Sequence, residues 1–169
     1  GSIAFDGTGD WLSSTDGSLN VFNTGDFTIE GWAYVTSYSG TNGTQQLVSK
    51  GSSGSGSGWY VAILTSGKLE FGRPNAPVAT STNTVGTSAW FHFAACRASG
   101  TTRVFINGNL EASTSDSVNY TDSTPTYIGV FGNGSAQPLT GYIDDLRITK
   151  GYARYTANFT PPTAALPTK

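Results

Sequence analysis

Acidic side chains and a single histidine are the residues of this chain that could support hydrolytic chemistry. Glycoside hydrolysis needs two carboxylates about 5–10 Å apart across the scissile bond. Glu30 and Glu70 each stand alone on a strand-like segment, whereas Asp144 and Asp145 are adjacent and point to opposite faces unless a bulge intervenes. His92 is the one candidate base for serine chemistry, and no serine lies in a nucleophile-elbow motif. The pattern predicts a domain that is not an enzyme, with His92 as a hydrogen-bonded interior residue.

One strand-like segment carries aromatic side chains where a solvated face is expected. In GDFTIEGWAYV (residues 25–35), strand alternation divides the side chains between two faces. The core face carries Phe27, Ile29, Ala33 and Val35. The opposite face carries Thr28, Glu30, Trp32 and Tyr34. Sugars stack their C–H faces on Trp and Tyr rings, and carboxylates accept bonds from their hydroxyls. Glu30, Trp32 and Tyr34 are therefore a candidate sugar platform. The alternative, preferred for Trp32 and Trp90, is that both are interior packing residues.

Further candidate contacts lie in the predicted loops along one rim of the fold. Trp11 and Trp59 neighbour Gly-rich turns and are expected to be exposed for stacking, while Tyr120 is another aromatic loop residue. The full set of predicted ligand-binding residues is Trp11, Trp59, Glu30, Trp32, Tyr34, Tyr38, Arg73 and Asn75.

The composition favours strands and limits the partners. The 169 residues include 22 Gly and no Met, with 12% aromatic and 12% charged residues. Gly, Ser and Thr favour turns and strands over helix, while the aromatic residues supply enough apolar area for a core. A net charge of −2 gives no attraction towards nucleic acid or anionic lipid. No apolar run approaches the roughly 20 residues of a membrane-spanning helix, so membrane insertion is not expected.

Short strand-like runs recur along the chain with turn residues between them. The predicted strands are Ser2–Phe5, Asp26–Val35, Gln45–Ser49, Trp59–Leu64, Lys68–Gly72, Ala89–Arg97, Thr102–Ile106, Thr126–Val130 and Gly141–Thr149. Asn107-Gly108 is the strongest hairpin signal, and Ser66-Gly67 is a second. The low-complexity stretch GSSGSGSG (residues 51–58) is expected to be a loop between two strands. Nine or more such strands without a helix predict an all-β antiparallel two-sheet sandwich.

Four blocks together carry a family resemblance. They are SIAFDGTGDWL near the start, GDFTIEGWAYV, WFHFAACR followed by TRVFINGNL, and GYIDDLRITKGYARYTANFTPPT at the end. In this order they resemble the laminin G-like jelly roll of the concanavalin A-like lectin/glucanase superfamily, and the last block resembles the version found in phage tail and other virion-associated proteins. The chain departs from the family pattern at Phe91, which stands where a second histidine is common, and at Asn107, where Asp is usual.

The resemblance implies a calcium site between the opening turn and the closing strand. Calcium takes six to eight oxygen ligands, and Gly-rich turns offer accessible carbonyls. The turn FDGTGD (residues 5–10) could place Asp6 near Asp144, so the predicted metal ligands are Asp6 and Asp144, holding one structural Ca²⁺. The alternative is that Asp6 caps its own turn, while Asp144 pairs with Arg147 or accepts backbone N–H bonds.

The C-terminal block gathers charge that is unusual for so uncharged a chain. Asp145 and Arg147 are two residues apart on one strand and could pair locally. The following segment, residues 155–169, is expected to be an extended tail laid over the sandwich with Tyr155 and Phe159 as anchors. This block is therefore interpreted as a structural clasp. Cys96, the single cysteine, is expected to be buried and inert.

The sequence thus predicts one laminin G-like domain over residues 1–169, in which residues 1–2 look like a tag remnant. Its predicted function is non-catalytic recognition of a cell-surface glycan, as part of a larger virion-associated or bacterial surface protein that can be homo-oligomeric. The alternatives are a structural or decoration domain that mediates protein contacts, and an endo-glycosidase whose carboxylates meet from different strands. The predicted location is the virion tail or fibre, or the cell surface.

Overall fold

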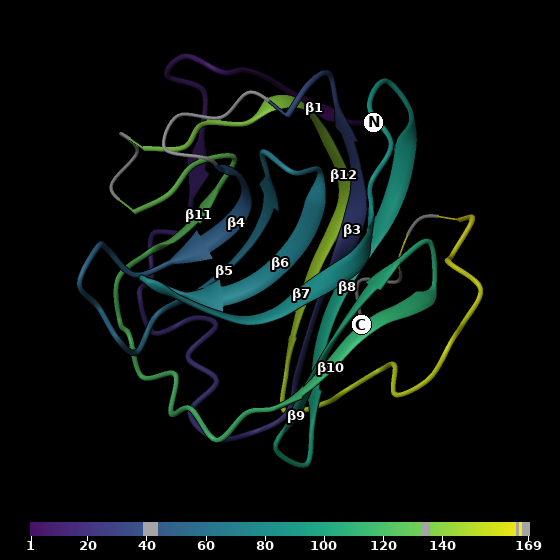
Figure 1. The fold of residues 1–169 in the computed structure, drawn as a ribbon. Coiled ribbons are helices and arrows are strands. Elements are labelled where there is room, and N and C mark those ends of the chain that lie inside the picture. Colours follow the sequence, from purple (N-terminus) through teal and green to yellow (C-terminus); the bar gives the residue numbers. More distant parts are fainter. Residues whose placement is uncertain (39–43, 133–135, 165, 167–169) are drawn as a thin grey trace.

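In the computed structural model, which describes residues 1–38, 44–132, 136–164 and 166, the chain folds into two antiparallel six-stranded sheets packed face to face (Figure 1). Sheet A has the order β1 (Ile3–Asp6), β12 (Thr140–Lys150), β3 (Phe27–Val35), β8 (Trp90–Ala98), β9 (Thr101–Ile106) and β10 (Asn109–Ser115). Sheet B has the order β2 (Leu12–Ser13), β11 (Thr126–Ile128), β4 (Thr44–Lys50), β5 (Trp59–Leu64), β6 (Lys68–Arg73) and β7 (Ala76–Thr84). The described residues include no helix, hence none long and apolar enough to cross a membrane. The predicted sandwich is confirmed.

The first and last strands lie side by side in sheet A, as expected from the sequence. Ile3 is opposite Ile143 and Asp6 is opposite Thr140 in the register of β1 and β12. The far edge of β12 then pairs with β3 along most of its length, interrupted by a bulge between Asp144 and Arg147. The closing strand is thus held on both sides, which fixes the direction in which the chain leaves the sheet after Lys150.

Aromatic rings fill one end of the space between the sheets. Phe22 stacks on Phe27 at 4.4 Å and on Trp59 at 5.0 Å between ring centroids, and Phe27 meets Phe71 at 5.2 Å. Tyr120 meets the edge of Phe71 at 5.8 Å. Complete burial of each such side chain stabilises the fold by about 1.5–3 kcal/mol.

Two of these core rings were expected in exposed loops, and that expectation is wrong. Trp59 has 0% of its surface exposed, and its indole Nε1 donates to the carbonyl of Asn20 at 3.0 Å. Tyr120 is also fully buried and donates its hydroxyl to Asp116 Oδ2 at 3.0 Å. Proximity to Gly-rich turns misled the assignment, because Trp59 begins a strand whose alternate residues Val61 and Ile63 face the core.

Turn chemistry agrees with the two predicted hairpins. Asn107 and Gly108 have φ values of 51° and 78°, the positive φ at both positions that a type I′ turn requires. Gly67, with φ 78°, donates its N–H to the Leu64 carbonyl and closes the β5–β6 turn. Strand β7 was not predicted, because APVATSTNT carries Pro77 and few apolar residues. It is the edge strand of sheet B, where such a sequence is tolerated.

The chain after β12 runs outside the sandwich on the outer face of sheet A, drawn in yellow in Figure 1. Phe159 N–H donates to the Gly108 carbonyl at 2.9 Å, and Leu110 N–H donates to Asn158 Oδ1 at 2.8 Å. Tyr155, Asn158 and Phe159 of the predicted tail, residues 155–169, therefore contact sheet A, while residues 165 and 167–169 lie outside the described residues.

Candidate functional site

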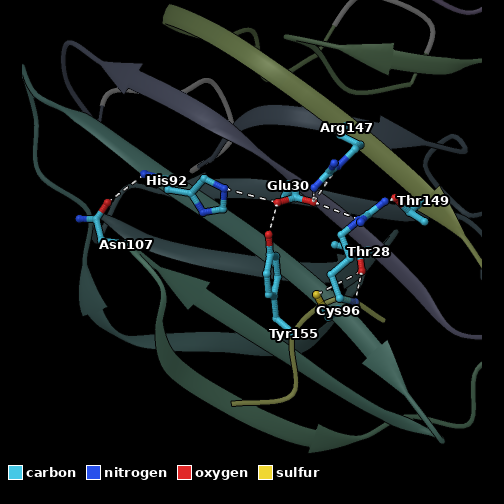
Figure 2. A network of polar contacts seen from close by, with 9 residues as sticks. Thr28, Glu30, His92, Cys96, Asn107, Arg147, Thr149 and Tyr155 are labelled. Carbon is cyan, nitrogen blue, oxygen red and sulfur yellow. Dashed lines mark hydrogen bonds and ion pairs between the residues drawn. The ribbon is translucent and has the colours of Figure 1, made fainter. Parts of the chain in front are cut away.

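The outer face of sheet A is divided into a half covered by the tail and an open half. In the covered half, Glu30 of β3 has a fully buried side chain with partners from three segments (Figure 2). Arg147 donates from Nε and Nη2 to Glu30 Oε1 at 2.9 and 2.6 Å, and the Tyr155 hydroxyl donates to Oε2 at 2.8 Å. Arg154 Nε lies 3.6 Å from Oε1. Glu30 therefore joins β3, β12 and the tail.

The electrostatics of Glu30 follow from these partners. Burial acts to raise the pKa of Glu30, but the neighbouring His92 ring, the Arg147 guanidinium and the Tyr155 hydroxyl outweigh it and hold the pKa below its ordinary value. Burial, together with the hydrogen bond to Glu30, raises the pKa of Tyr155, so its hydroxyl stays a donor. The carboxylate is thus ionised and fully engaged, which leaves it unsuited to binding a sugar.

Aromatic stacking fixes the tail above this network. The Tyr155 and Phe159 rings lie parallel, 3.5 Å apart at their centroids, and Phe159 meets Phe105 at 5.4 Å. Beneath them Cys96 is buried, and burial raises the pKa of its thiol to about 11. The predictions of a structural clasp and of an inert cysteine agree with this geometry.

His92 lies between the covered and open halves. It is fully buried between Trp32 and Phe159, whose rings meet it edge-on at 5.4 and 5.6 Å. Its Nε2 lies 3.6 Å from Glu30 Oε2, an electrostatic contact beyond hydrogen-bond length, and among the described residues neither ring nitrogen has a hydrogen-bond partner. The interior position was predicted correctly, whereas the expected hydrogen bond is absent from the part of the chain that the structure describes.

The open half of sheet A exposes a cluster of aromatic rings. Trp90 and Tyr142 are 43% and 40% exposed, and both meet Tyr34 at about 5.7 Å in tilted or edge-on geometry. The expectation that Trp90 is an interior residue is therefore wrong, and Trp32 is only partly buried. The predicted platform is also corrected, because Glu30 is sealed under the tail and only Trp32 and Tyr34 reach the open surface.

The opening turn holds its own carboxylates in local bonds. Asp6 Oδ1 accepts from Thr8 N–H at 2.6 Å, and Asp10 Oδ2 accepts from Asp6 N–H at 3.1 Å. Asp6 is opposite Thr140, so Asp144 lies four residues further along β12, about 13 Å at the rise of a strand. A single ion shared by Asp6 and Asp144 is therefore not supported by this register, and calcium binding itself stays a prediction.

The bulge in β12 explains the remaining charged residues. Asp145 has a φ of 48°, and its N–H donates to Asp144 Oδ1 at 2.9 Å. The bulge turns the strand so that Arg147 comes opposite Glu30, and the expected pairing of Arg147 with Asp145 does not form.

A groove of about 320 Å³ lies on the outer face of sheet B, at the small end of the range for ligand pockets. Its walls come from β4, β5, the loop after β4, the β6–β7 turn and the segment before β12. The lining residues are Thr44, Gln46, Ser53, Tyr60, Pro74, Asn75, Ala76, Pro77, Phe131, Ala136 and Gln137. They comprise two aromatic rings, three amides and hydroxyl groups, with no charged side chain.

Tyr60 is held rigidly at the base of this groove. Its hydroxyl donates to Glu70 Oε1 at 2.7 Å, and Thr80 Oγ1 donates to Glu70 Oε2 at 2.7 Å. The ring crosses over Gly72, where a Cβ would approach Tyr60 Cζ to 2.5 Å, so this close approach requires glycine. Phe131 stands nearly perpendicular to Tyr60, with ring centroids 6.4 Å apart. The two rings form a fixed aromatic corner.

Two of the three amides in the lining are bonded to each other. Gln46 Nε2 donates to Gln137 Oε1 at 2.8 Å, and Gln46 N–H donates to the Gln137 carbonyl at 3.1 Å. Gln46 Oε1 and Thr44 Oγ1 are buried and have no hydrogen-bond partner among the described residues.

The predicted ligand-binding residues lie at separate places in the fold. Asn75, at the β6–β7 turn with φ 69°, lines the groove. Trp11 is 41% exposed as expected, but it packs on Tyr127 of sheet B, away from that groove. The Tyr38 hydroxyl donates to the Val85 carbonyl, and its ring covers a turn glycine. Arg73 is not among the residues that line the groove.

Sequence reasoning missed Tyr60, Phe131, Gln46 and Gln137, which lie on different segments. For Tyr60 a signal was present, because strand alternation places it opposite Trp59 and Val61. Phe131 and Gln137 flank a loop whose path no local pattern fixes. Of these four residues, Tyr60 is therefore the one that a sequence signal could have identified.

The two strand glutamates, Glu30 and Glu70, are not placed as a catalytic pair. Glu30 is on the outer face of sheet A and Glu70 on the outer face of sheet B, so the core separates them. Across the described ranges, no group of three or more His, Cys, Asp or Glu side chains is placed to hold a metal ion.

The fold and the groove define a class of all-β, lectin-like sandwich domains. The chain belongs to the Laminin_G_3 family, described as the concanavalin A-like lectin/glucanases superfamily, which matches residues 6–154. Comparison with curated proteins finds no match.

Solved structures of low sequence identity share the fold. Domain 4 of the extracellular arabinanase AbnA from Geobacillus stearothermophilus, in complex with arabinotriose, is 19% identical, with a TM-score of 0.67 over 90% of this chain and 71% of that chain. The CBM40 of the Ruminococcus gnavus IT-sialidase, bound to α2,3-sialyllactose, is 18% identical, with a TM-score of 0.67 over 91% of each chain. Mouse laminin α1 domains LG4–5 are 16% identical, with a TM-score of 0.69 over 97% of this chain and 47% of that one.

Proposed function

We propose that the domain is a non-catalytic glycan-recognition module, and that the groove on sheet B is its saccharide site. The observation that carries the proposal is the lining itself: the Tyr60 and Phe131 rings stand beside the amides of Gln46, Asn75 and Gln137. Aromatic faces bind the C–H face of a sugar, and amides bind its hydroxyls in both donor and acceptor roles. Similar folds in complex with arabinotriose and with sialyllactose support the class of ligand.

The test is a glycan array followed by isothermal titration calorimetry on the strongest hit. Tyr60→Ala removes the base of the groove and is expected to weaken binding at least tenfold, about 1.4 kcal/mol. Trp90→Ala, which removes an exposed ring from the opposite face, is the matched control and is expected to keep wild-type affinity. Loss of binding in Trp90→Ala alone would move the site to sheet A, and no hit for the wild type would discard glycan recognition.

We propose further that the module belongs to a larger virion-associated or bacterial surface protein and acts outside the cell. Support comes from the resemblance of ARYTANFTPPT to tail-protein sequences and from similar structures that are parts of longer chains, such as the mouse laminin pair. The coding sequence that flanks this domain tests the proposal. A neighbouring tail-fibre or cell-wall hydrolase domain is expected, and a cytoplasmic metabolic enzyme in the same chain would contradict it.

A protein-contact function is the second candidate, and one observation favours it. At the edge formed by β1 and β2, Ile3 and Leu12 are exposed beside a hollow of about 360 Å³ whose other walls include Phe5, Ile128 and Ile143. An exposed apolar edge can mark a protein interface. Light scattering after size-exclusion chromatography should then show an oligomer that Leu12→Ser disrupts, and a monomer at high concentration would argue against a contact between copies.

Calcium binding at the opening turn is a separate proposal. Asp6 and Asp10 lie close together there, and a neighbouring backbone carbonyl could complete a ligand set. If calcium binds, excess EGTA should lower the melting temperature at neutral pH, and magnesium should not restore it. An unchanged melting temperature with EGTA would exclude a structural calcium.

A further inference from the structure

We infer that the groove on sheet B selects uncharged saccharides and rejects those that carry a carboxylate, such as sialic or uronic acids. This inference rests on the proposed saccharide site. It names the class of ligand that this site takes, which the similar folds leave open because their ligands include both arabinotriose and sialyllactose.

The described lining of the groove contains no cation. None of its eleven residues is Lys, Arg or His, and Arg73, adjacent in sequence to Pro74, is not among them. Recognition of a sugar carboxylate usually needs an arginine fork or a lysine, because a desolvated anion without such a partner is unfavourable. The groove offers only amides and hydroxyls.

A buried carboxylate is bonded directly to Tyr60 of the aromatic corner. Glu70 is 8% exposed, and among the described residues it has hydroxyl partners, Tyr60 and Thr80, but no ion-pair partner. Burial, and then the hydrogen bond and charge of Glu70, raise the pKa of Tyr60, so the field of this carboxylate reaches the groove wall. An anionic ligand stacked on Tyr60 would be repelled by it.

The amides that line the groove favour hydroxyl groups. Asn75 is exposed and Gln137 is partly exposed, so both side chains can meet a ligand, whereas Gln46 is buried and positions Gln137 by donating from Nε2 to its Oε1 at 2.8 Å. An amide offers both a donor and an acceptor, which suits the hydroxyls of a sugar. The site therefore suits a neutral polyol surface.

The experiment is an array that prints each glycan backbone in neutral, sialylated and uronic-acid forms, followed by calorimetry on the best neutral hit and its acidic counterpart. The neutral form is expected to bind at least tenfold more tightly. Gln46→Leu, which keeps the volume but removes the amide that positions Gln137, is expected to weaken that binding about tenfold. Asn75→Arg, an exposed rim change, is expected to add binding of the acidic counterpart.

Each of the following outcomes would overturn one part of the proposal. Preference for the acidic forms, lost in Tyr60→Ala, would overturn the selectivity while keeping the saccharide site. Neutral hits unaffected by Tyr60→Ala and Asn75→Arg would overturn the site itself. Absence of any hit would overturn the proposed function. If Gln46→Leu melts well below wild type, Gln137→Ala at the more exposed end of the same amide pair replaces it, with the same expected loss.

Discussion

Two buried glutamates occupy comparable places on the two outer faces of the sandwich, yet their surroundings differ. Glu30 in sheet A is bonded by Arg147 and Tyr155, approached by Arg154, and covered by the tail. Glu70 in sheet B has two hydroxyl partners and, within the described residues, no cation. One face is closed around its charge, while the other leaves a carboxylate beside an open groove.

The two buried charges therefore have different consequences. A buried carboxylate needs compensation, and in sheet A two arginines provide it and tie the closing strand to the tail. In sheet B the carboxylate has only hydrogen-bond partners among the described residues, so its field extends to the groove wall. We therefore assign stability to the face of Glu30, and the proposed saccharide site lies on the face of Glu70.

Loss of the Glu30 carboxylate should destabilise the fold more than loss of the Glu70 carboxylate. Glu30→Ala removes the shared partner of Arg147 and Tyr155 and should lower the free energy of unfolding by about 3 kcal/mol. This is the low end of the cost of breaking a buried ion pair, because Arg147 and Arg154 are partly exposed and can rehydrate. Glu70→Ala leaves only two hydroxyls unpaired and should cost about 1–2 kcal/mol. Urea unfolding of both variants checks this order. Equal losses would mean that the tail side is not the more strongly held face.

A smaller effect is expected for the tail anchors. Phe159→Ala removes a half-buried ring from the stack with Tyr155 and should cost about 1–2 kcal/mol. The exposed Tyr152, changed to Ala, is the control and should cost about 0.5 kcal/mol or less.

Thiol chemistry reports the same anchors independently. A chain that ends before Tyr152 should expose Cys96 and make it react with Ellman's reagent faster than the intact domain, because burial is what raises its pKa. Unchanged reactivity would show that the tail does not cover the cysteine in solution.

Much of the fold was predictable from sequence, because local signals agree with it. The period-2 pattern of residues 25–35, the Asn107-Gly108 turn and the closing strand each appear where expected. Failures arose where tertiary context decides. Trp59 and Trp90 both begin strands, but one faces the core and the other solvent, and strand pairing rather than neighbouring residues determines which.

The candidate site was less predictable than the fold. The groove is lined by residues that are distant in sequence: Gln46, Tyr60, Asn75, Phe131 and Gln137. Gln46 and Gln137, which are hydrogen-bonded to each other, are 91 residues apart. Of these only Asn75 was predicted. A groove built across strands and loops depends on long-range strand register, which a single sequence does not reveal. The C-terminal clasp was easier to predict, because it directly follows β12 in the sequence.

Acid should reduce the contribution of Glu30 to the free energy of unfolding. The pKa of Glu30 is lower in the folded state than the ordinary value of about 4.3, so its contribution is present above that value and is lost as pH falls through the lowered folded pKa. Each unit by which the pKa is lowered corresponds to about 1.4 kcal/mol. Unfolding free energies measured between neutral pH and acid should therefore fall more for wild type than for Glu30→Gln. Parallel curves would show that Glu30 is not the linked group.

A single added methyl group at Gly72 tests whether the position of the Tyr60 ring matters for binding. In Gly72→Ala the new methyl group would lie 2.5 Å from Tyr60 Cζ, and the nearby Ala76 carbonyl oxygen, at 3.0 Å, limits relief by backbone movement. The Tyr60 ring must therefore shift, so saccharide affinity should fall a few-fold, and the free energy of unfolding should fall by about 1 kcal/mol, the low end of the cost of overpacking. Calorimetry with the best array hit measures the first effect and urea unfolding the second. Gly56→Ala, in the loop after β4 where a Cβ meets nothing within 4 Å, is the matched control and should leave both unchanged. Wild-type affinity in Gly72→Ala would show that the fixed position of the Tyr60 ring does not contribute to binding.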